Sequence, residues 1–247
     1  MILRRIRRAV ALAFVLTFCV LRYWSTRLRG AMTLEQHALW LHHTARRVLK
    51  CLKVNTRIDG APPSCGLVVA NHLSYLDVVI FSAIMPCFFI AKHEVERWPF
   101  FGMAARMGGT IFLDRSSQAS AIAVAGIIEQ RLKLPVPVLL FPEGTSTDGA
   151  QVLPFHSRLI APATEAGVPI TAAAIRYELT DGLAERELCW FDAATFLPHL
   201  GKVLGVAEFT AHLQFGESQV YPDRRAAAIL THAEISAMRE AGAEVAQ

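Results

Sequence analysis

The sequence has few cysteines, and none of them are arranged in pairs. The five cysteines are scattered through 247 residues, and no CxxC spacing occurs. This absence argues against both a disulfide framework and a structural zinc site. Scattered reduced thiols are typical of a protein, or a face of a protein, in contact with the cytosol.

Acidic residues are almost absent from the first quarter of the chain. Residues 1–57 contain 12 Lys and Arg but one acid, Glu35, and carry a formal charge of +11, whereas residues 58–247 carry −7. A basic block of this kind favours nucleic acid or anionic lipid as a partner. Here the basic residues flank an apolar segment, so we expect lipid headgroups and no nucleic acid.

The uncharged run at residues 9–21 is too short to cross a bilayer unaided, because it spans about 20 Å as a helix against roughly 30 Å of hydrocarbon. No small-x-small cleavage site follows it, and three arginines come soon after, which argues against a signal peptide. We predict a retained anchor or interfacial helix at the inner membrane, with the active site facing the cytoplasm. The arginines expected on the cytoplasmic side are Arg4, Arg5, Arg7 and Arg8.

A second basic helix is predicted over residues 33–54. Thr33 and Gln36 match a capping box, and apolar residues recur at steps of three and four. The helix lies either on the membrane or against the protein core. We therefore divide the chain into membrane-associated helices at residues 1–57 and one domain at residues 58–247.

After a linker closed by Pro62 and Pro63, strand-like apolar runs alternate with helical ones. This alternation predicts an α/β fold with a mainly parallel sheet. The expected strands are 67–70, 87–91, 110–113, 136–141, 170–177 and 207–215. The expected helices are 75–85, 97–107, 118–132, 157–166, 194–203 and 223–238.

An imidazole and a carboxylate follow the first of these strands, in the stretch ANHLSYLDVV at residues 70–79. Positions five apart do not face each other on one helix, so His72 must precede the helix if it is to contact Asp77. Ser74 is a suitable N-cap, which places Asp77 at the third helical position. Asp77 then either completes a capping box or orients His72 as a base. The same spacing between His212 and Glu217 is read as accidental, inside a strand and hairpin.

Two further motifs carry polar residues at strand ends. In VPVLLFPEGTSTDG, Glu143 ends a strand, and Gly144 permits either a plain Pro-Gly turn or an anion-binding nest. In MGGTIFLDR, Arg115 is placed to bind a phosphate or to pair with Asp114 or Glu129. No GxSxG motif is present, so a substrate hydroxyl is a candidate nucleophile.

These motifs resemble, in order, the four blocks of the glycerolipid acyltransferases: NHLSYLD, GTIFLDR, FPEGT and VPITAAAI. The resemblance implies that His72 is the general base and Asp77 orients it. The acceptor hydroxyl would attack a fatty acyl thioester on acyl-CoA or acyl carrier protein. No metal, cofactor or covalent enzyme intermediate is implied. The head group of the lysolipid acceptor would be held by Arg115, Glu143, Gly144, Thr145 and Lys92.

One departure from the family pattern concerns the acceptor. The third block usually ends in Arg, whereas this chain has Ser146. The first acceptor that the family implies is 1-acyl-sn-glycerol-3-phosphate, giving phosphatidic acid. The sequence around Ser146 is more similar to the branch of the family that includes lyso-ornithine lipid acyltransferases. The acceptor of those enzymes carries an amino acid. A non-catalytic lipid-binding protein on the same fold is the alternative of another class.

Overall fold

The computed structural model describes residues 2–98, 101–114, 118–180 and 182–244. Within these ranges a single seven-stranded sheet forms the centre of the molecule, in the order β1-β7-β6-β2-β5-β3-β4. Only β6 and β7 pair antiparallel, so the predicted mainly parallel α/β sheet is confirmed. The strands are β1 (Val54–Asp59), β2 (Leu67–Ala70), β3 (Phe88–Lys92), β4 (Ile111–Leu113), β5 (Val138–Leu140), β6 (Ile170–Leu179) and β7 (Phe209–Phe215).

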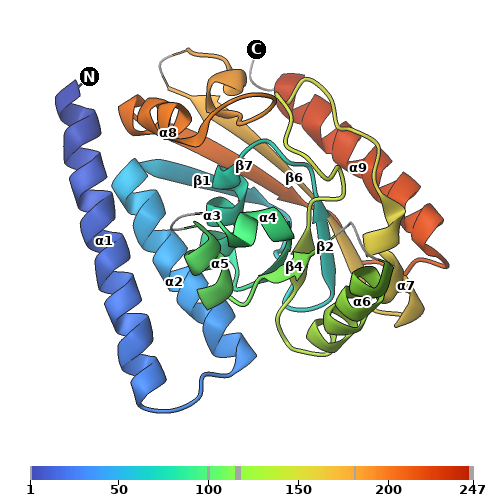
Figure 1. Cartoon of the computed structure of the whole chain (residues 1–247). Helices are drawn as coiled ribbons and strands as arrows, with labels where there is room; N and C mark the ends of the chain where they lie inside the picture. The colour runs from blue at the N-terminus through green and yellow to red at the C-terminus, as the bar shows by residue number, and fades with distance from the viewer. Residues whose placement is uncertain (1, 99–100, 115–117, 181, 245–247) are drawn as a thin grey trace.

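Helices cover both faces of the sheet (Figure 1). One face packs against α2 (Leu34–Leu52), α3 (Tyr75–Ile84) and α8 (Phe196–Gly205). The other packs against α6 (Gln118–Leu132), α7 (Ala161–Glu165) and α9 (Arg224–Glu244). All four side chains of β2 are fully buried because the strand lies between these two layers. Two apolar layers on a central parallel strand place the carboxyl end of β2 deep within the fold.

The helix α2 begins with the predicted capping box. Gln36 N donates to Thr33 Oγ1 (3.3 Å), and Thr33 N donates to Gln36 Oε1 (3.0 Å). Val48, Leu49 and Leu52 on its apolar face are buried in the same cluster as α3 and β2. The helix therefore packs against the core, which is the second of the two arrangements expected from the sequence.

The first helix, α1 (Ile2–Leu28), lies along the outside of α2 and reaches α8 (Figure 1). Its inner face contributes Cys19 and Tyr23 to a small cluster with Trp40 and Met107. Arg8 donates to the carbonyls of Val206 and Ala207, and Arg4 donates to that of Gly205 (2.9 Å). These arginines satisfy carbonyls at the C-terminus of α8, where helix ends favour positive charge. Arg4 and Arg8, which the sequence predicts on the cytoplasmic side, thus contact the protein itself.

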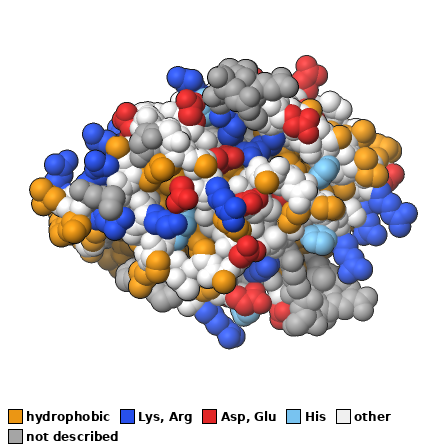
Figure 2. Space-filling view, turned by 90° about the horizontal axis from the view of Figure 1, so that it is seen from above, with side chains coloured by type: hydrophobic (Ala, Val, Ile, Leu, Met, Phe, Trp, Pro, Cys, Tyr) orange, Lys and Arg blue, Asp and Glu red, His pale blue; other side chains and the backbone are white. Residues whose placement is uncertain are grey.

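The outer face of α1 is an apolar stripe. Its side chains are between 46% and 86% exposed and recur every three or four residues along the helix. Figure 2 shows hydrophobic and basic side chains together at the edge of the molecule, on the side where Figure 1 draws α1. Among the described residues, α1 is the one helix long and apolar enough to cross a membrane. The stripe consists of Ile2, Leu3, Ile6, Val10, Phe14, Phe18, Leu21, Trp24 and Leu28.

Three elements differ from the sequence prediction. The strand β1 was not predicted, and it lies across the expected division between residues 57 and 58. The side chains of β1 are mostly exposed and show no apolar alternation that would predict a strand. The segment is a strand because it pairs with β7. Of the expected helix 97–107, α5 covers Phe101–Met107, and a separate short helix, α4 (His93–Glu96), precedes it. The expected helix 157–166 is a 3₁₀ turn, η1 (Ser157–Leu159), followed by α7.

Candidate active site

The turn between β2 and α3 brings His72 back over the first turn of the helix. The strand ends at Ala70, Ser74 adopts the extended conformation of an N-cap, and α3 begins at Tyr75. The Asp77 carboxylate accepts a hydrogen bond from the Ser74 amide (3.0 Å), as the third residue of a capping box does. Both contacts expected of Asp77 are therefore present, because the same carboxylate also reaches His72.

His72 Nδ1 lies 2.7 Å from Asp77 Oδ2. Asp77 is fully buried, whereas the His72 side chain keeps 19% of its surface exposed. In a neutral imidazole that donates from Nδ1 to this carboxylate, Nε2 keeps its lone pair. The imidazole also stacks on Phe141, with ring centroids 4.1 Å apart and planes at 14°. The ring is fixed on one side and partly open to solvent, which is the arrangement a general base requires.

Glu143 is buried behind the same turn, with only 4% of its surface exposed. Its Oε1 accepts from the amide of His72 (2.7 Å), and its Oε2 accepts from the amide of Leu153 (2.8 Å). Burial raises the pKa of this carboxyl, and the two backbone hydrogen bonds oppose that rise. Both carboxylate oxygens are thus engaged by the backbone, so the structure places Glu143 as a support for the His72 turn. A head-group contact, as expected from the sequence, would have to compete with these bonds.

The loop after Glu143 folds over His72. Gly144 has φ +73°, and its amide donates to Phe141 O (3.2 Å), so this amide closes a turn. Thr147 N donates to His72 O (2.9 Å), which joins the loop to His72. Ser146 Oγ donates to the carbonyl of Trp190, and Trp190 N donates to Leu73 O (2.8 Å). Ser146 therefore ties the third block to a segment that itself contacts the residue beside His72.

The remaining predicted head-group residues lie in different places. Thr145 is exposed on the loop over His72. Lys92 is exposed at the carboxyl end of β3, and since β3, β5 and β2 run parallel, it lies at the same edge of the sheet as His72. Arg115 falls outside the described residues.

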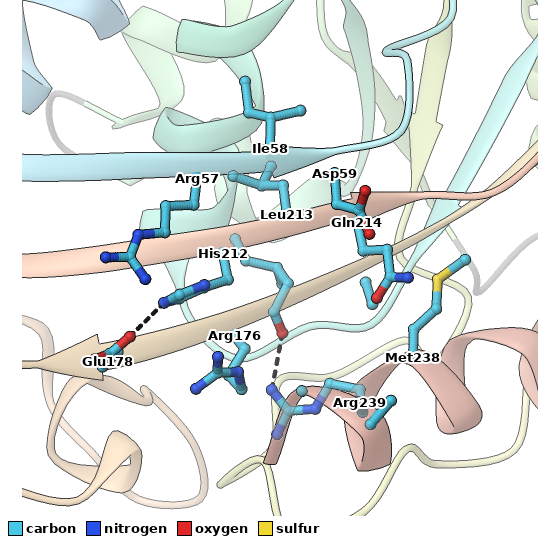
Figure 3. Close-up of a pocket in the computed structure, with 14 residues that line it drawn as sticks. Arg57, Ile58, Asp59, Arg176, Glu178, His212, Leu213, Gln214, Met238 and Arg239 are labelled. Carbon is cyan, nitrogen blue, oxygen red and sulfur yellow. Dashed lines mark hydrogen bonds and ion pairs between the residues drawn. The ribbon is translucent and has the colours of Figure 1, made fainter. Parts of the chain in front are cut away.

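The second His–acid pair with this spacing, His212 and Glu217, does not form a hydrogen-bonded pair among the described residues. His212 on β7 bonds instead to Glu178 on the neighbouring β6 (Nε2 to Oε2, 2.6 Å). This ion pair lines a cavity of about 430 Å³ between β1, β7, β6 and the C-terminal part of α9 (Figure 3). Glu178 belongs to the sheet face opposite Tyr177, which reaches Asp77. The cavity is therefore separated from the His72–Asp77 pair by the sheet.

Sequence reasoning missed two residues of the site, Asn71 and Tyr177. Asn71 is buried and bonds through both amide atoms to Ile175 (2.8 and 3.1 Å). The hydroxyl of Tyr177 donates to Asp77 Oδ1. Asn71 adjoins a motif residue and could have been suspected from that position alone. Tyr177 lies 100 residues from Asp77, and no local spacing connects them.

The structure thus places a histidine–carboxylate pair at the carboxyl end of a central parallel strand, the edge of the sheet where α/β proteins usually bind their ligands. The sequence profile of the family described as Acyltransferase matches residues 53–176. This match covers half of the chain and includes all four predicted blocks, so the chain belongs to the Acyltransferase family.

Three curated relatives show how the chain compares within this family. It is 37% identical over 172 residues to the lyso-ornithine lipid O-acyltransferase of Pseudomonas aeruginosa, covering 69% of this chain and 66% of that protein. It is 40% identical over 146 residues to the Rhodobacter capsulatus protein of the same name, covering 58% and 52%. It is 35% identical over 136 residues to the 1-acyl-sn-glycerol-3-phosphate acyltransferase of Neisseria meningitidis, covering 53% of each chain. The chain thus spans about half to two thirds of the length of these relatives.

A solved structure shares the fold along nearly the whole chain. The 1-acyl-sn-glycerophosphate acyltransferase PlsC from Thermotoga maritima superposes with a TM-score of 0.69. The match covers 97% of this chain and 94% of that chain, at 16% sequence identity. This likeness concerns the arrangement of the sheet and helices.

Proposed function

We propose that the chain transfers a fatty acyl group from an acyl thioester to the free hydroxyl of a lysolipid. The observation that carries this proposal is the 2.7 Å contact between His72 Nδ1 and Asp77 Oδ2, which leaves Nε2 available as a base. Nε2 takes the proton of the acceptor hydroxyl as its oxygen attacks the thioester carbonyl. Collapse of the tetrahedral intermediate breaks the carbon–sulfur bond, and the leaving thiolate takes the proton from His72. Asp77 stabilises the imidazolium in between.

Of the two acceptors predicted from the sequence, we propose lyso-ornithine lipid, with 1-acyl-sn-glycerol-3-phosphate as the second candidate. Two observations support this order. Ser146 stands where the family usually has Arg, and its hydroxyl is used in a contact with Trp190. Three relatives named lyso-ornithine lipid O-acyltransferase share 36–40% identity with the chain. A phosphomonoester acceptor usually needs more than one cation, and replacing Arg by Ser removes one.

We further propose that the enzyme works on the cytoplasmic face of the inner membrane, with acyl-CoA or acyl carrier protein as donor. The exposed apolar stripe of α1 supports a helix that lies in the interface, because the opposite face of α1 is packed on the protein. Acceptors of this kind reside in the bilayer, so an interfacial enzyme meets them without extracting them.

The test is an acyl-transfer assay with purified full-length protein in lipid vesicles. A labelled acyl donor is offered with a panel of lysolipids, and the products are separated by thin-layer chromatography. We expect the diacyl product from lyso-ornithine lipid, and none from the His72→Ala protein. Binding of lysolipids without any transfer would support the non-catalytic alternative and reject the proposal.

A further inference from the structure

Tyr177 reaches Asp77 from β6, the strand beside β2, on the sheet face that packs against α3. It lies on β6, is 2% exposed, and packs its ring edge-on against Phe209 with centroids 5.6 Å apart. Its hydroxyl donates a hydrogen bond to Asp77 Oδ1. Burial, followed by the negative charge of Asp77, raises the pKa of this phenol far above its ordinary value. The phenol of Tyr177 therefore stays protonated and donates a hydrogen bond to Asp77 at every working pH.

The two oxygens of Asp77 have separate partners. Oδ2 accepts from His72 Nδ1 (2.7 Å), from Leu73 N (2.7 Å) and from Ser74 N (3.0 Å). Among the described residues, Oδ1 accepts from Tyr177 alone. A carboxylate held at one oxygen can still turn about its own bond, whereas donors at both oxygens fix its plane. The Tyr177 hydroxyl thus sets the orientation in which Oδ2 faces the imidazole.

The backbone around Tyr177 is held as firmly as its hydroxyl. Tyr177 N donates to Glu185 Oε1 (2.7 Å), and Arg239 on α9 binds both oxygens of Glu185 (3.0 and 2.9 Å). Arg239 also donates to Ile175 O (2.8 Å) on β6 and to Gly149 O (2.5 Å) in the loop after Glu143. Figure 3 shows the Arg239 side chain rising from α9 toward the strand. One guanidinium therefore joins α9, β6 and the loop beside the site, in the forked geometry that suits arginine.

We propose that Tyr177 is a positioning residue of the transferase, which orients Asp77 and moderates its charge, with Arg239 and Glu185 fixing it in place. The inference rests on the proposed function, since it assigns His72 as the base. If Oδ1 loses its donor, the Asp77 carboxylate keeps more of its charge for the imidazole. A protonated His72 is then held more tightly, and the base is available only at higher pH.

The experiment compares Tyr177→Phe with wild type in the acyl-transfer assay. We expect kcat to fall about 10- to 100-fold, the effect of losing one hydrogen bond to a charged group, with KM for both substrates unchanged. We also expect the acidic limb of the pH–kcat profile to move to higher pH. A merely structural role would lower the folded fraction and leave that limb in place. The matched control is Tyr221→Phe, a buried tyrosine in the cluster on the other sheet face, which should retain the wild-type rate and profile.

A second variant at position 177 keeps the test informative if Tyr177→Phe does not fold. Incorporation of 3-fluorotyrosine at position 177 keeps the shape and makes the hydroxyl a stronger donor, so the acidic limb should move to lower pH. Unchanged kcat and unchanged pH profiles in the folded variants overturn the inference, even where His72→Ala is inactive. If wild type transfers no acyl group to any lysolipid, the proposed function itself is rejected, and the inference with it.

Discussion

The amide nitrogen of His72 donates to Oε1 of Glu143 at 2.7 Å, while the side chain of the same histidine contacts Asp77. Two carboxylates thus hold one residue, one by its backbone and one by its ring. The first holds the turn in place, and the second holds the imidazole with Nδ1 facing the carboxylate. Substitutions of His72, Asp77 and Glu143 should therefore have different effects on activity and stability.

Replacing the base should remove transfer. Positioned general-base catalysis contributes about 10²–10⁴-fold, so kcat of His72→Ala should fall by at least that range. Asp77→Asn should also lower kcat, because an amide nitrogen facing Nδ1 favours the wrong tautomer. The measurement is steady-state kinetics on proteins whose folding is verified by circular dichroism. Near-normal turnover in a folded His72→Ala protein would refute the mechanism.

Glu143→Ala should affect stability as well as rate. It leaves the partly buried amides of His72 and Leu153 without acceptors, and each orphaned donor costs up to about 1–3 kcal/mol. We expect a lower free energy of unfolding in urea and a lower kcat, with KM for the acceptor little changed. If Glu143 binds the head group instead, KM rises and stability stays near wild type. Thr145→Ala, an exposed neighbour on the same loop, is the matched control for stability.

Ser146→Arg should shift acceptor preference toward a phosphate. A charge-assisted hydrogen bond is worth roughly 1.5–3 kcal/mol, or about one to two decades in affinity, so KM for 1-acyl-sn-glycerol-3-phosphate should fall. For a lyso-ornithine acceptor, the change should help little or hinder through repulsion of its amine. The control is Ser146→Ala, which removes the contact to Trp190 without adding charge. Equal kcat/KM ratios for the two acceptors in all three proteins would place Ser146 away from the head group.

His199 should make the fold sensitive to mild acid. It is 6% exposed on α8, its Nδ1 lies 3.1 Å from Tyr75 Oη, and burial lowers its pKa below 6.5. Since the unfolded chain binds this proton more readily, the contribution is fully present above pH 6.5. It is lost as pH falls from 6.5 through the lowered pKa. Thermal unfolding from pH 7.5 to 5 should show a smaller decline for His199→Gln than for wild type. An identical decline in both proteins would exclude this group as the cause.

The outer stripe of α1 should contribute to membrane binding but not to the thermal stability of the protein. Val10, Phe14 and Leu21 are 64–75% exposed, and each fully buried side chain of this size contributes roughly 1.5–3 kcal/mol. Replacing all three by Gln should release the protein from vesicles with an anionic component, at unchanged Tm. The control replaces Ile229 and Leu230, which are exposed on α9. Equal vesicle binding by both multiple variants would argue against the stripe as the contact.

The parts of the fold and site that sequence predicted are those specified by local pattern. The strand at residues 67–70 and the helix at 118–132 agree with prediction because apolar runs and spacing determine them within a few residues. The placement of His72 before α3 followed from helix geometry, given a contact with Asp77, and from Ser74 as the N-cap. By contrast, Glu143 binds backbone amides in two other segments, and no side-chain pattern encodes a backbone partner. The contribution of Tyr177 depends on β6 pairing beside β2, a long-range arrangement that spacing does not reveal.

The pairing of β1 with β7 bears on how the chain folds as it is synthesised. Val54 lies opposite Phe209, so β1 has no partner in the sheet until about 150 further residues have left the ribosome. At the roughly 5–20 residues per second of translation, that delay is on the order of 10–30 s. During this delay α1 and α2 have been synthesised but the sheet is incomplete. The helix α8, whose C-terminal end Arg4 and Arg8 contact, has also not yet formed. The contacts of Arg4 and Arg8 that hold α1 to the end of α8 therefore form only late in synthesis.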